Sequence, residues 1–232
     1  MLVLLDIDGT LLHGSPRAHT AALVAAMREV HGVPAEADDL AVIRPGGRTD
    51  QEIARLVLRR HGVDDDAITA AMPRWMDRAA ARYADEEARH PGSAVPPDAP
   101  AALGRMRRAG GSLALLTGNL EPIARAKMAR AGLGAWFQKG EGAFGSDHER
   151  RDALVPIALA RAAAAGEPPA GVVVVGDTPR DIACARAGGA RCVAVATGPH
   201  PARELAAADA VAADLRAAAA AVEGLLRARA PL

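Results

Sequence analysis

Four short apolar runs, three of which end in polar or acidic residues, constrain the fold of this chain more than any other feature. The runs are Leu2–Ile7, Leu113–Leu116, Val172–Val175 and Cys192–Ala196. Each has the length of a strand and is almost continuously apolar, which is typical of strands buried on both faces. Segments with helical periodicity separate the runs. We therefore expect a parallel sheet whose strands are joined by right-handed helical crossovers.

The long stretch from residue 15 to residue 90 contains no convincing strand and repeats its apolar residues with a helical period. Stops at His31-Gly32 and His61-Gly62 divide it into helices. The sequence thus predicts an α/β fold in which a Rossmann-like parallel-sheet core comprises residues 1–14 and 91–232. An all-helical domain, residues 15–90, is expected to be inserted between the first strand and the rest.

Helices are also expected between and after the later strands, where apolar residues recur between proline starts and glycine stops. Their expected ranges are Ala101–Arg108, Pro122–Ala131, Asp152–Ala165 and Pro179–Ala187, and the alanine-rich tail after Asp214 is expected to form one more.

The composition excludes several classes of protein. Basic and acidic residues number 28 each, so the chain lacks the basic excess of a nucleic-acid-binding protein. Charges or glycines interrupt every apolar run well short of the about 20 residues of a membrane span, and no basic region typical of a signal peptide precedes Asp6. Cys184 and Cys192 lack metal-ligand spacing and are expected to be buried thiols in a reducing compartment. We therefore expect a cytoplasmic protein.

Four carboxylates gather at the predicted strand ends. Asp6 and Asp8 are two residues apart where the first strand ends. Asp177 and Asp181 are four apart at a helix start, which places them on one helix face. Ligands of open parallel sheets bind at this edge. Acids that converge there repel one another unless a cation lies among them, and an all-oxygen ligand set favours Mg²⁺.

Three motifs occur in order at these strand ends, namely Asp6-Ile7-Asp8-Gly9-Thr10, Leu116-Thr117-Gly118-Asn119 and Gly176-Asp177-Thr178-Pro179-Arg180-Asp181. They resemble the first, second and fourth motifs of the haloacid dehalogenase superfamily, in particular its capped, phosphoglycolate-phosphatase-like hydrolases. The resemblance covers essentially the whole chain, since the helical insertion falls where that superfamily places its helical cap. It implies a Mg²⁺-dependent phosphatase that hydrolyses a small phosphomonoester through an aspartyl-phosphate.

The resemblance also implies a role for each acidic residue. Asp6 is expected to attack phosphorus, while Asp8 protonates the leaving alcohol and then activates water. Mg²⁺ is expected to be held by Asp6, the main-chain carbonyl of Asp8, and Asp177. Asp181 is expected behind these ligands, where it would orient them.

Two loops are expected to contact the substrate. The hydroxyl of Thr117, which we count among the catalytic groups, and the amides of Gly118 and Asn119 are expected to hold the phosphoryl oxygens. Arg48 lies in a loop that opens a helix of the insertion, and in capped relatives such a loop faces the site and meets the organic part of the substrate. His13 is interpreted as a hinge or surface residue, because an aspartate already fills the acid/base role.

The third motif departs from the family. The superfamily usually places a lysine at the start of the helix before the fourth-motif strand, but neither Lys127 nor Lys139, the only lysines of the chain, is near that position. Arg150 and Arg151 are there instead, and an arginine can neutralise a phosphoryl group with a permanent, bidentate charge. The distance back from Asp177 favours Arg151 as the catalytic arginine.

Within the superfamily, dehalogenation is disfavoured because it has no use for Asp8. Phosphonate cleavage through a lysine Schiff base is disfavoured because residues 15–90 contain no lysine. A sugar phosphomutase similar to β-phosphoglucomutase stays open, since it uses the same aspartate pair and a cap of similar size.

Functions of two other classes fit the sequence less well. A phospho-receiver domain would place its acceptor on a middle strand and would lack the insertion. A dinucleotide-binding module would depend on Gly140–Gly145, a G-x-G-x-x-G string that follows no good strand and opens no immediate helix, so we interpret it as a loop that borders the site. The partner we expect is a small phosphorylated metabolite, with phosphoglycolate, a sugar phosphate and a nucleotide monophosphate all open. The chain is expected to be a monomer or homodimer.

Overall fold

A computed structural model describes residues 1–14, 16–90, 92–166 and 169–228. Its centre is a parallel sheet with strand order β2-β1-β3-β4-β5. The strands are β1 (Leu2–Leu5), β2 (Ser112–Leu115), β3 (Val172–Gly176), β4 (Arg191–Val195) and β5 (Ala210–Ala212). The first four match the predicted apolar runs to within two residues at each end, and the α/β prediction is confirmed. The strand β5, which has three residues and lies at the edge of the sheet, is not among the strands expected from the sequence.

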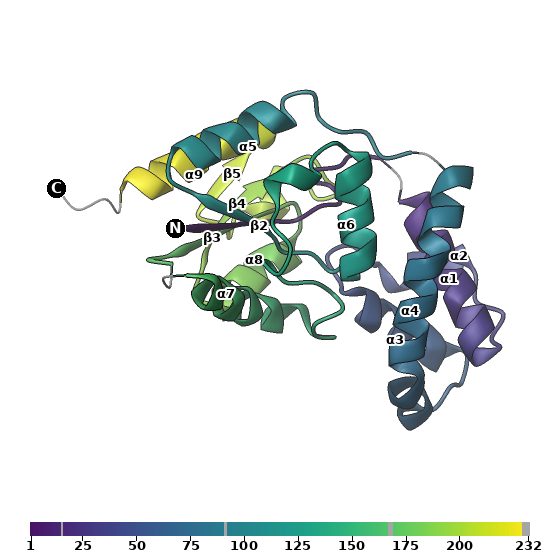
Figure 1. Cartoon of the computed structure of the whole chain (residues 1–232). Coiled ribbons are helices and arrows are strands. Elements are labelled where there is room, and N and C mark those ends of the chain that lie inside the picture. The colour runs from purple at the N-terminus through teal and green to yellow at the C-terminus, as the bar shows by residue number, and fades with distance from the viewer. Residues whose placement is uncertain (15, 91, 167–168, 229–232) are drawn as a thin grey trace.

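Helices cover both faces of the sheet (Figure 1). On one face lie α5 (Ala99–Arg108) and α9 (Leu215–Arg227), and on the other lie α7 (Leu154–Ala165) and α8 (Pro179–Ala187). Alternate residues of β1 to β4 enter the two cores, since Val3 packs with α5 and α9 while Leu4 packs with α7 and α8. Short 3₁₀ helices occur at Gly134–Trp136, Arg151–Ala153 and Ala202–Leu205.

The inserted helices form a second hydrophobic core beyond the carboxyl ends of the strands (Figure 1). They are α1 (Arg17–His31), α2 (Ala37–Ile43), α3 (Asp50–Arg60) and α4 (Asp65–Arg89). Trp75 and Met72 are buried in this core, so they do not form an exposed dimer face. We call these four helices the cap. The helix α6 (Glu121–Arg130) lies between the sheet and the cap, and Ile123 of α6 packs into the cap core.

The two segments that connect core and cap run side by side. His13 and Ala94 form an antiparallel bridge in which each amide donates to the other's carbonyl, at 2.8 and 2.7 Å. The predicted domain boundaries at Ser15 and Pro91 lie outside the described residues, so the division into 1–14 with 91–232 and 15–90 stays a prediction. Among the described residues, every helix is too short or too polar to span a membrane.

Candidate active site

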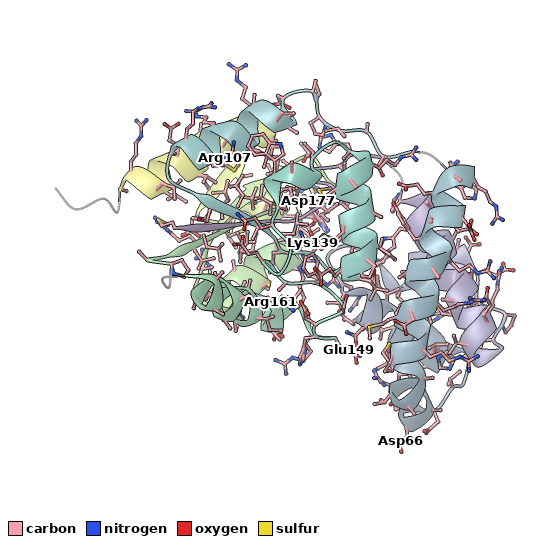
Figure 2. The ribbon with its side chains drawn as sticks, viewed as in Figure 1. Asp66, Arg107, Lys139, Glu149, Arg161 and Asp177 are labelled. Carbon is pink, nitrogen blue, oxygen red and sulfur yellow. The ribbon has the colours of Figure 1, made fainter. Side chains whose placement is uncertain are left out.

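Three loops that leave neighbouring strands form the site. Asp6 follows β1, Thr117 and Asn119 follow β2, and Asp177 follows β3. Because β1 is hydrogen-bonded to both β2 and β3 in parallel register, their carboxyl ends lie at one edge of the sheet. Figure 2 shows Asp177 in the interior of the molecule at this edge, whereas Asp66 lies at the far end of the cap.

Asp6, Asp177 and Asp181 form a buried acidic cluster. Each contributes a carboxylate oxygen, and these oxygens all lie within 4.8 Å of one another. The three residues are 5%, 1% and 0% exposed. Burial raises the pKa of Asp6, an effect that Arg151 opposes and that the neighbouring carboxylates of Asp181 and Asp8 reinforce. Burial also raises the pKa of Asp177, and the charges of Asp6 and Asp181 raise it further.

Asp181 is held by the start of α8. One of its oxygens, Oδ2, accepts from the amide and the hydroxyl of Thr178 at 3.0 and 2.7 Å, and Thr178 in turn caps the amide of Asp181 in a capping box. Its other oxygen, Oδ1, accepts from Arg151. Both carboxylate oxygens therefore have partners within the protein. Asp177 has fewer restraints, since its Oδ1 accepts from Thr10 at 3.4 Å.

Two glycines leave room for Asp177. A Cβ at Gly9, whose φ is +89°, would lie 2.2 Å from Oδ2 of Asp177, and a Cβ at Gly198 would lie 1.7 Å from the same oxygen. The conformation of Gly9 is also one that L side chains rarely adopt. The glycine of the first motif is thus required both by its backbone and by the carboxylate beside it.

Arg151, and not Arg150, reaches the site. Arg151 is 7% exposed, and its Nη2 donates to Oδ1 of Asp6 at 3.1 Å and to Oδ1 of Asp181. Arg150 points outward and is paired with Asp152 at 2.8 Å. A 3₁₀ turn at Arg151–Ala153 replaces the first residues of the helix predicted from Asp152, and this turn directs Arg151 inward.

The loop after β2 is held from both sides. The amide of Asp50 in the cap donates to the carbonyl of Gly118 at 2.8 Å, and the amide of Gly145 donates to the carbonyl of Asn119 at the same distance. A Cβ at Gly118 would lie 1.9 Å from the carbonyl oxygen of Arg48, so the cap loop packs directly on this backbone. The Gly140–Gly145 string contacts this loop through Gly145, and no helix follows the string directly.

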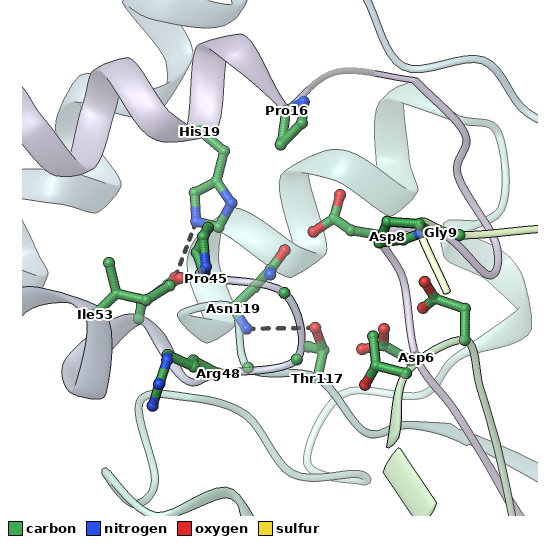
Figure 3. A pocket seen from close by; sticks show the side chains of 18 of the residues that line it. Asp6, Asp8, Gly9, Pro16, His19, Pro45, Arg48, Ile53, Thr117 and Asn119 are labelled. Atoms are coloured by element: carbon green, nitrogen blue, oxygen red, sulfur yellow. Dashed lines mark hydrogen bonds and ion pairs between the residues drawn. The ribbon is translucent and has the colours of Figure 1, made fainter. Parts of the chain in front are cut away.

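A single cavity of about 440 Å³ joins these groups (Figure 3). Asp6 and Asp8 lie on its core side, with His19, Arg48 and Ile53 across from them on the cap side. Of the residues predicted to act, the ones that line it are Asp6, Asp8, Arg48, Thr117, Gly118, Asn119, Arg151 and Asp177. Asp181 is not among the lining residues, and it lies behind Arg151.

A sequence profile for haloacid dehalogenase-like hydrolases matches residues 1–189. The chain belongs to this family. A comparison with curated protein sequences returns no match.

Solved structures of this family share the fold at low sequence identity. A protein from Bacteroides vulgatus assigned as a β-phosphoglucomutase has a TM-score of 0.67 at 19% identity, with 97% of this chain and 89% of that chain covered. An assigned phosphoglycolate phosphatase from Haemophilus somnus has a TM-score of 0.63 at 18% identity, with 93% and 94% covered. CbbY from Rhodobacter sphaeroides, solved with phosphate, has a TM-score of 0.63 at 21% identity, with 93% and 96% covered. The hydrolase therefore has the capped fold shared by phosphatases and phosphomutases of the family.

The acidic cluster of this family member fits a divalent cation. Three buried carboxylates lie together, and within the described ranges the cation in direct contact with them is the guanidinium of Arg151. The pKa values of Asp6 and Asp177 are raised, first by burial and then by the neighbouring carboxylates, and a bound cation would offset both effects. Oxygen donors alone suit a hard ion.

Lys127 is a site residue of this hydrolase that the sequence motifs do not identify. Its Nζ lies 2.6 Å from Oδ2 of Asp8 and 2.7 Å from Oδ1 of Asn119. Burial alone would raise the pKa of Asp8, but the charge of Lys127 and its hydrogen bond lower it overall. A signal was available, because Lys127 falls on the buried face of α6, where its neighbours are Ile123, Ala124 and Met128.

His13 lies at the edge of the site. It lines the cavity, and its Nε2 is buried without a hydrogen-bond partner among the described residues. Its bridge to Ala94 agrees with the hinge position expected for it.

Proposed function

We propose that this hydrolase is a Mg²⁺-dependent phosphatase that cleaves a small phosphomonoester through an aspartyl-phosphate on Asp6. The observation that supports this most is the single cavity in which Asp6 and Asp8 meet the loop after β2 and Arg151. A carboxylate nucleophile, an acid/base group and anion-binding donors are the parts that phosphoryl transfer needs.

In the first step, a carboxylate oxygen of Asp6 attacks phosphorus as the bond from phosphorus to the leaving oxygen breaks. Asp8 donates a proton to that oxygen, and the alcohol departs. In the second step, Asp8 takes a proton from water, whose oxygen attacks phosphorus. The bond to Asp6 breaks, the Asp6 carboxylate is restored, and inorganic phosphate leaves.

The surrounding donors would stabilise the phosphoryl group in both steps. Arg151 contacts the nucleophile, so its guanidinium is available to oxygens of a phosphoryl group bound there. Thr117 and the amides of Gly118 and Asn119 would bind the remaining oxygens. The low exposure of Arg151 strengthens its effect, because charges interact more strongly where water is excluded.

We propose that Mg²⁺ is held by Asp6, the main-chain carbonyl of Asp8, and Asp177. When bound, this ion would neutralise charge on the nucleophile and the phosphoryl group. Asp181 would support the site from behind, as suggested by its two oxygens, which already accept from Thr178 and Arg151.

The cap side of the cavity supports a substrate whose organic part is compact and largely apolar. Leu23, Leu40 and Ile53 contribute aliphatic side chains to it. Arg48 lines it too, but it forms an ion pair with Glu52, so its charge is balanced before a substrate binds. We propose that Arg48 borders the organic part of the substrate.

A sugar phosphomutase is the second candidate, because structures assigned to β-phosphoglucomutases share the fold. Such an enzyme must hold a hydroxyl-rich sugar through two orientations, which needs polar groups on the cap side. Two of the polar cap residues that line the cavity, His19 and Asp50, are bonded to each other at 3.0 Å. This wall therefore favours the phosphatase.

The proposed setting is cytoplasmic. The free, buried thiols Cys184 and Cys192 support a reducing compartment. A small phosphorylated metabolite as partner, and a monomer or homodimer as the state in solution, stay predictions.

Hydrolysis of p-nitrophenyl phosphate with and without Mg²⁺ tests the proposal, alongside Asp6→Asn. We expect turnover with Mg²⁺ that chelation abolishes, and a loss of about 10³-fold or more in kcat for Asp6→Asn, as for other covalent nucleophiles. Acid-quenched protein should carry phosphate in the wild type and none in Asp6→Asn. Full turnover in Asp6→Asn would exclude the mechanism.

A further inference from the structure

Lys127 is a buried cation with a complete set of partners. It is 3% exposed. Its Nζ donates to Asp8 at 2.6 Å and to Asn119 at 2.7 Å, and it lies 3.2 Å from Nδ1 of His19. An ammonium group has three N–H donors, so these three contacts use all of them. Asp8 and Asn119 belong to the core, whereas His19 belongs to α1 of the cap.

The contact to His19 continues into a network that closes back on the core. Because Nδ1 of His19 accepts from Lys127, its Nε2 carries the proton and donates to Oδ2 of Asp50 at 3.0 Å. The same oxygen of Asp50 accepts from the amide of Leu120 at 2.7 Å. Leu120 follows Asn119 directly, so both ends of the network meet at the loop after β2.

Because this network is buried, its contacts can be satisfied only when the cap is docked on the core in this position. His19 and Asp50 are 7% and 1% exposed, so water cannot readily replace a broken contact. A buried polar group that loses its partner bears its full desolvation penalty. If the cap moved away from the core, Lys127 would lose His19, and Asp50 would lose Leu120.

We propose that Lys127 is a positioning residue that fixes the carboxylate of Asp8 and the side chain of Asn119 in the cavity. Through His19, this placement depends on the docked cap. The proposal rests on the acid/base role proposed for Asp8. It adds that α6, which lies outside the four family motifs, supplies through Lys127 the group that holds Asp8. It also adds that the cap takes part in the chemical step through His19.

Comparing substrates that have different leaving groups distinguishes this positioning role from a purely structural one. An alkoxide leaves only with a proton from Asp8, whereas p-nitrophenolate is stable enough to leave without one. The ratio kcat/KM covers the steps up to departure of the leaving group. Misplacing Asp8 should therefore reduce kcat/KM far more for an alkyl phosphate than for p-nitrophenyl phosphate. A general loss of folded structure would reduce both equally.

The experiment compares Lys127→Met with wild type on n-butyl phosphate and p-nitrophenyl phosphate, in the presence of Mg²⁺. We expect kcat/KM to fall at least about tenfold more for n-butyl phosphate, within the range of general acid catalysis. Lys139→Met is the matched control, because Lys139 is the other lysine of the chain and is exposed. It should change neither value. Equal losses on the two esters, or no loss in Lys127→Met, would overturn the proposal.

His19→Leu tests the link to the cap and keeps the proposal testable where Lys127→Met does not fold. It should show the same selective loss on n-butyl phosphate. In a double-mutant cycle on kcat/KM for that ester, the two changes should be strongly non-additive, with the double variant no worse than Lys127→Met alone. Additive losses, or a His19→Leu enzyme without leaving-group selectivity, would overturn the cap link.

Failure of the proposed function is distinguishable from failure of this inference. A wild type inactive on both esters, or an active Asp6→Asn, would refute the phosphatase and the inference with it. An active wild type with inactive Asp6→Asn, and equal losses on both esters for Lys127→Met, would leave the phosphatase in place and remove the role of Lys127.

Discussion

Arg151 and Asp6, which are 145 positions apart in the sequence, form a buried ion pair in which Nη2 of Arg151 lies 3.1 Å from Oδ1 of Asp6. The guanidinium also donates through Nη1 to the carbonyl of Gly47 in the cap, at 3.2 Å. One side chain thus contacts the proposed nucleophile and the loop that closes over it. The position where the family usually carries lysine is filled here by a residue with more donors.

The first prediction concerns this arginine. Arg151→Ala should lower kcat by about 10²–10³-fold, the range for losing one preorganised transition-state donor. Arg150→Ala is the matched control, since Arg150 is exposed and paired with Asp152, and it should stay within about twofold of wild type because exposed pairs contribute little. Steady-state kinetics on p-nitrophenyl phosphate measures both. A larger loss in Arg150→Ala would reverse the assignment.

The second prediction concerns pH and metal. In the metal-free protein the pKa values of Asp6 and Asp177 are raised, chiefly by burial. Above the ordinary carboxyl pKa of about 4, the folded state then binds more protons than the unfolded state. These two groups therefore make the metal-free protein less stable as pH rises from about 4 through the raised pKa values, about 7 for Asp6 and about 8 for Asp177. Mg²⁺ binds the ionised form, so it should stabilise the protein more at high pH.

Thermal melts with EDTA and with Mg²⁺, at about pH 6 and about pH 8, measure this effect through ligand linkage. The rise in Tm caused by Mg²⁺ should be larger at the higher pH. Asp177→Asn should abolish most of it, while Asp66→Asn, at the far end of the cap (Figure 2), should leave it unchanged. A Mg²⁺ effect that is equal at both pH values, or that persists in Asp177→Asn, would contradict the proposed site.

Local sequence signals were sufficient for the sheet and for most of the site. The apolar runs identified β1 to β4, because strands buried on both faces are continuously apolar. The helix α8 was predicted at its observed bounds, Pro179–Ala187, since a capping residue and proline mark its start and glycine its end. The three motif loops met at one edge because parallel strands end together.

Two features that the sequence does not predict, the strand β5 and the contact of Lys127 with Asp8, depend on tertiary contacts. The strand β5 has three residues, of which Val211 is exposed, and its structure comes from pairing with β4. The contact of Lys127 with Asp8 joins residues 119 positions apart, and it depends on how α6 packs against the loop after β1. The choice between Arg150 and Arg151 was not missed, because the distance from Asp177 already favours Arg151, and the structure adds the 3₁₀ turn at Arg151–Ala153 that directs this side chain inward.

The third prediction concerns the space around Asp177. Gly198→Ala would place a Cβ 1.7 Å from Oδ2 of Asp177, so the carboxylate must move. Mg²⁺ affinity should fall by about 10–100-fold, as when the surroundings of a metal ligand are changed. Gly224→Ala in α9 is the control, because a Cβ there meets no atom within 4 Å, and it should stabilise the helix by about 0.5–1 kcal/mol. Melting temperatures measured over a Mg²⁺ titration give the Mg²⁺ affinity and the stability of both variants. Unchanged affinity in Gly198→Ala would argue against Asp177 as a ligand.

The fourth prediction concerns the aliphatic cap wall. Ile53 lines the cavity and is 5% exposed, so it would contact the organic part of a bound substrate. Wild type should therefore have a higher kcat/KM for n-butyl phosphate than for a hexose 6-phosphate, whose hydroxyls would lose water against this wall without regaining hydrogen bonds.

Ile53→Ala removes aliphatic surface from that contact and should lower kcat/KM for n-butyl phosphate by about tenfold, since small losses in a hydrophobic pocket are each worth about 1–3 kcal/mol. The hexose phosphate should be affected less, because it gains little from the wall in the first place. Val42→Ala is the matched control, as Val42 is 59% exposed and outside the cavity lining. Preference of the wild type for the hexose phosphate would instead favour the phosphomutase, because only a cap that supplies polar contacts can hold a sugar against Asp6 in two orientations.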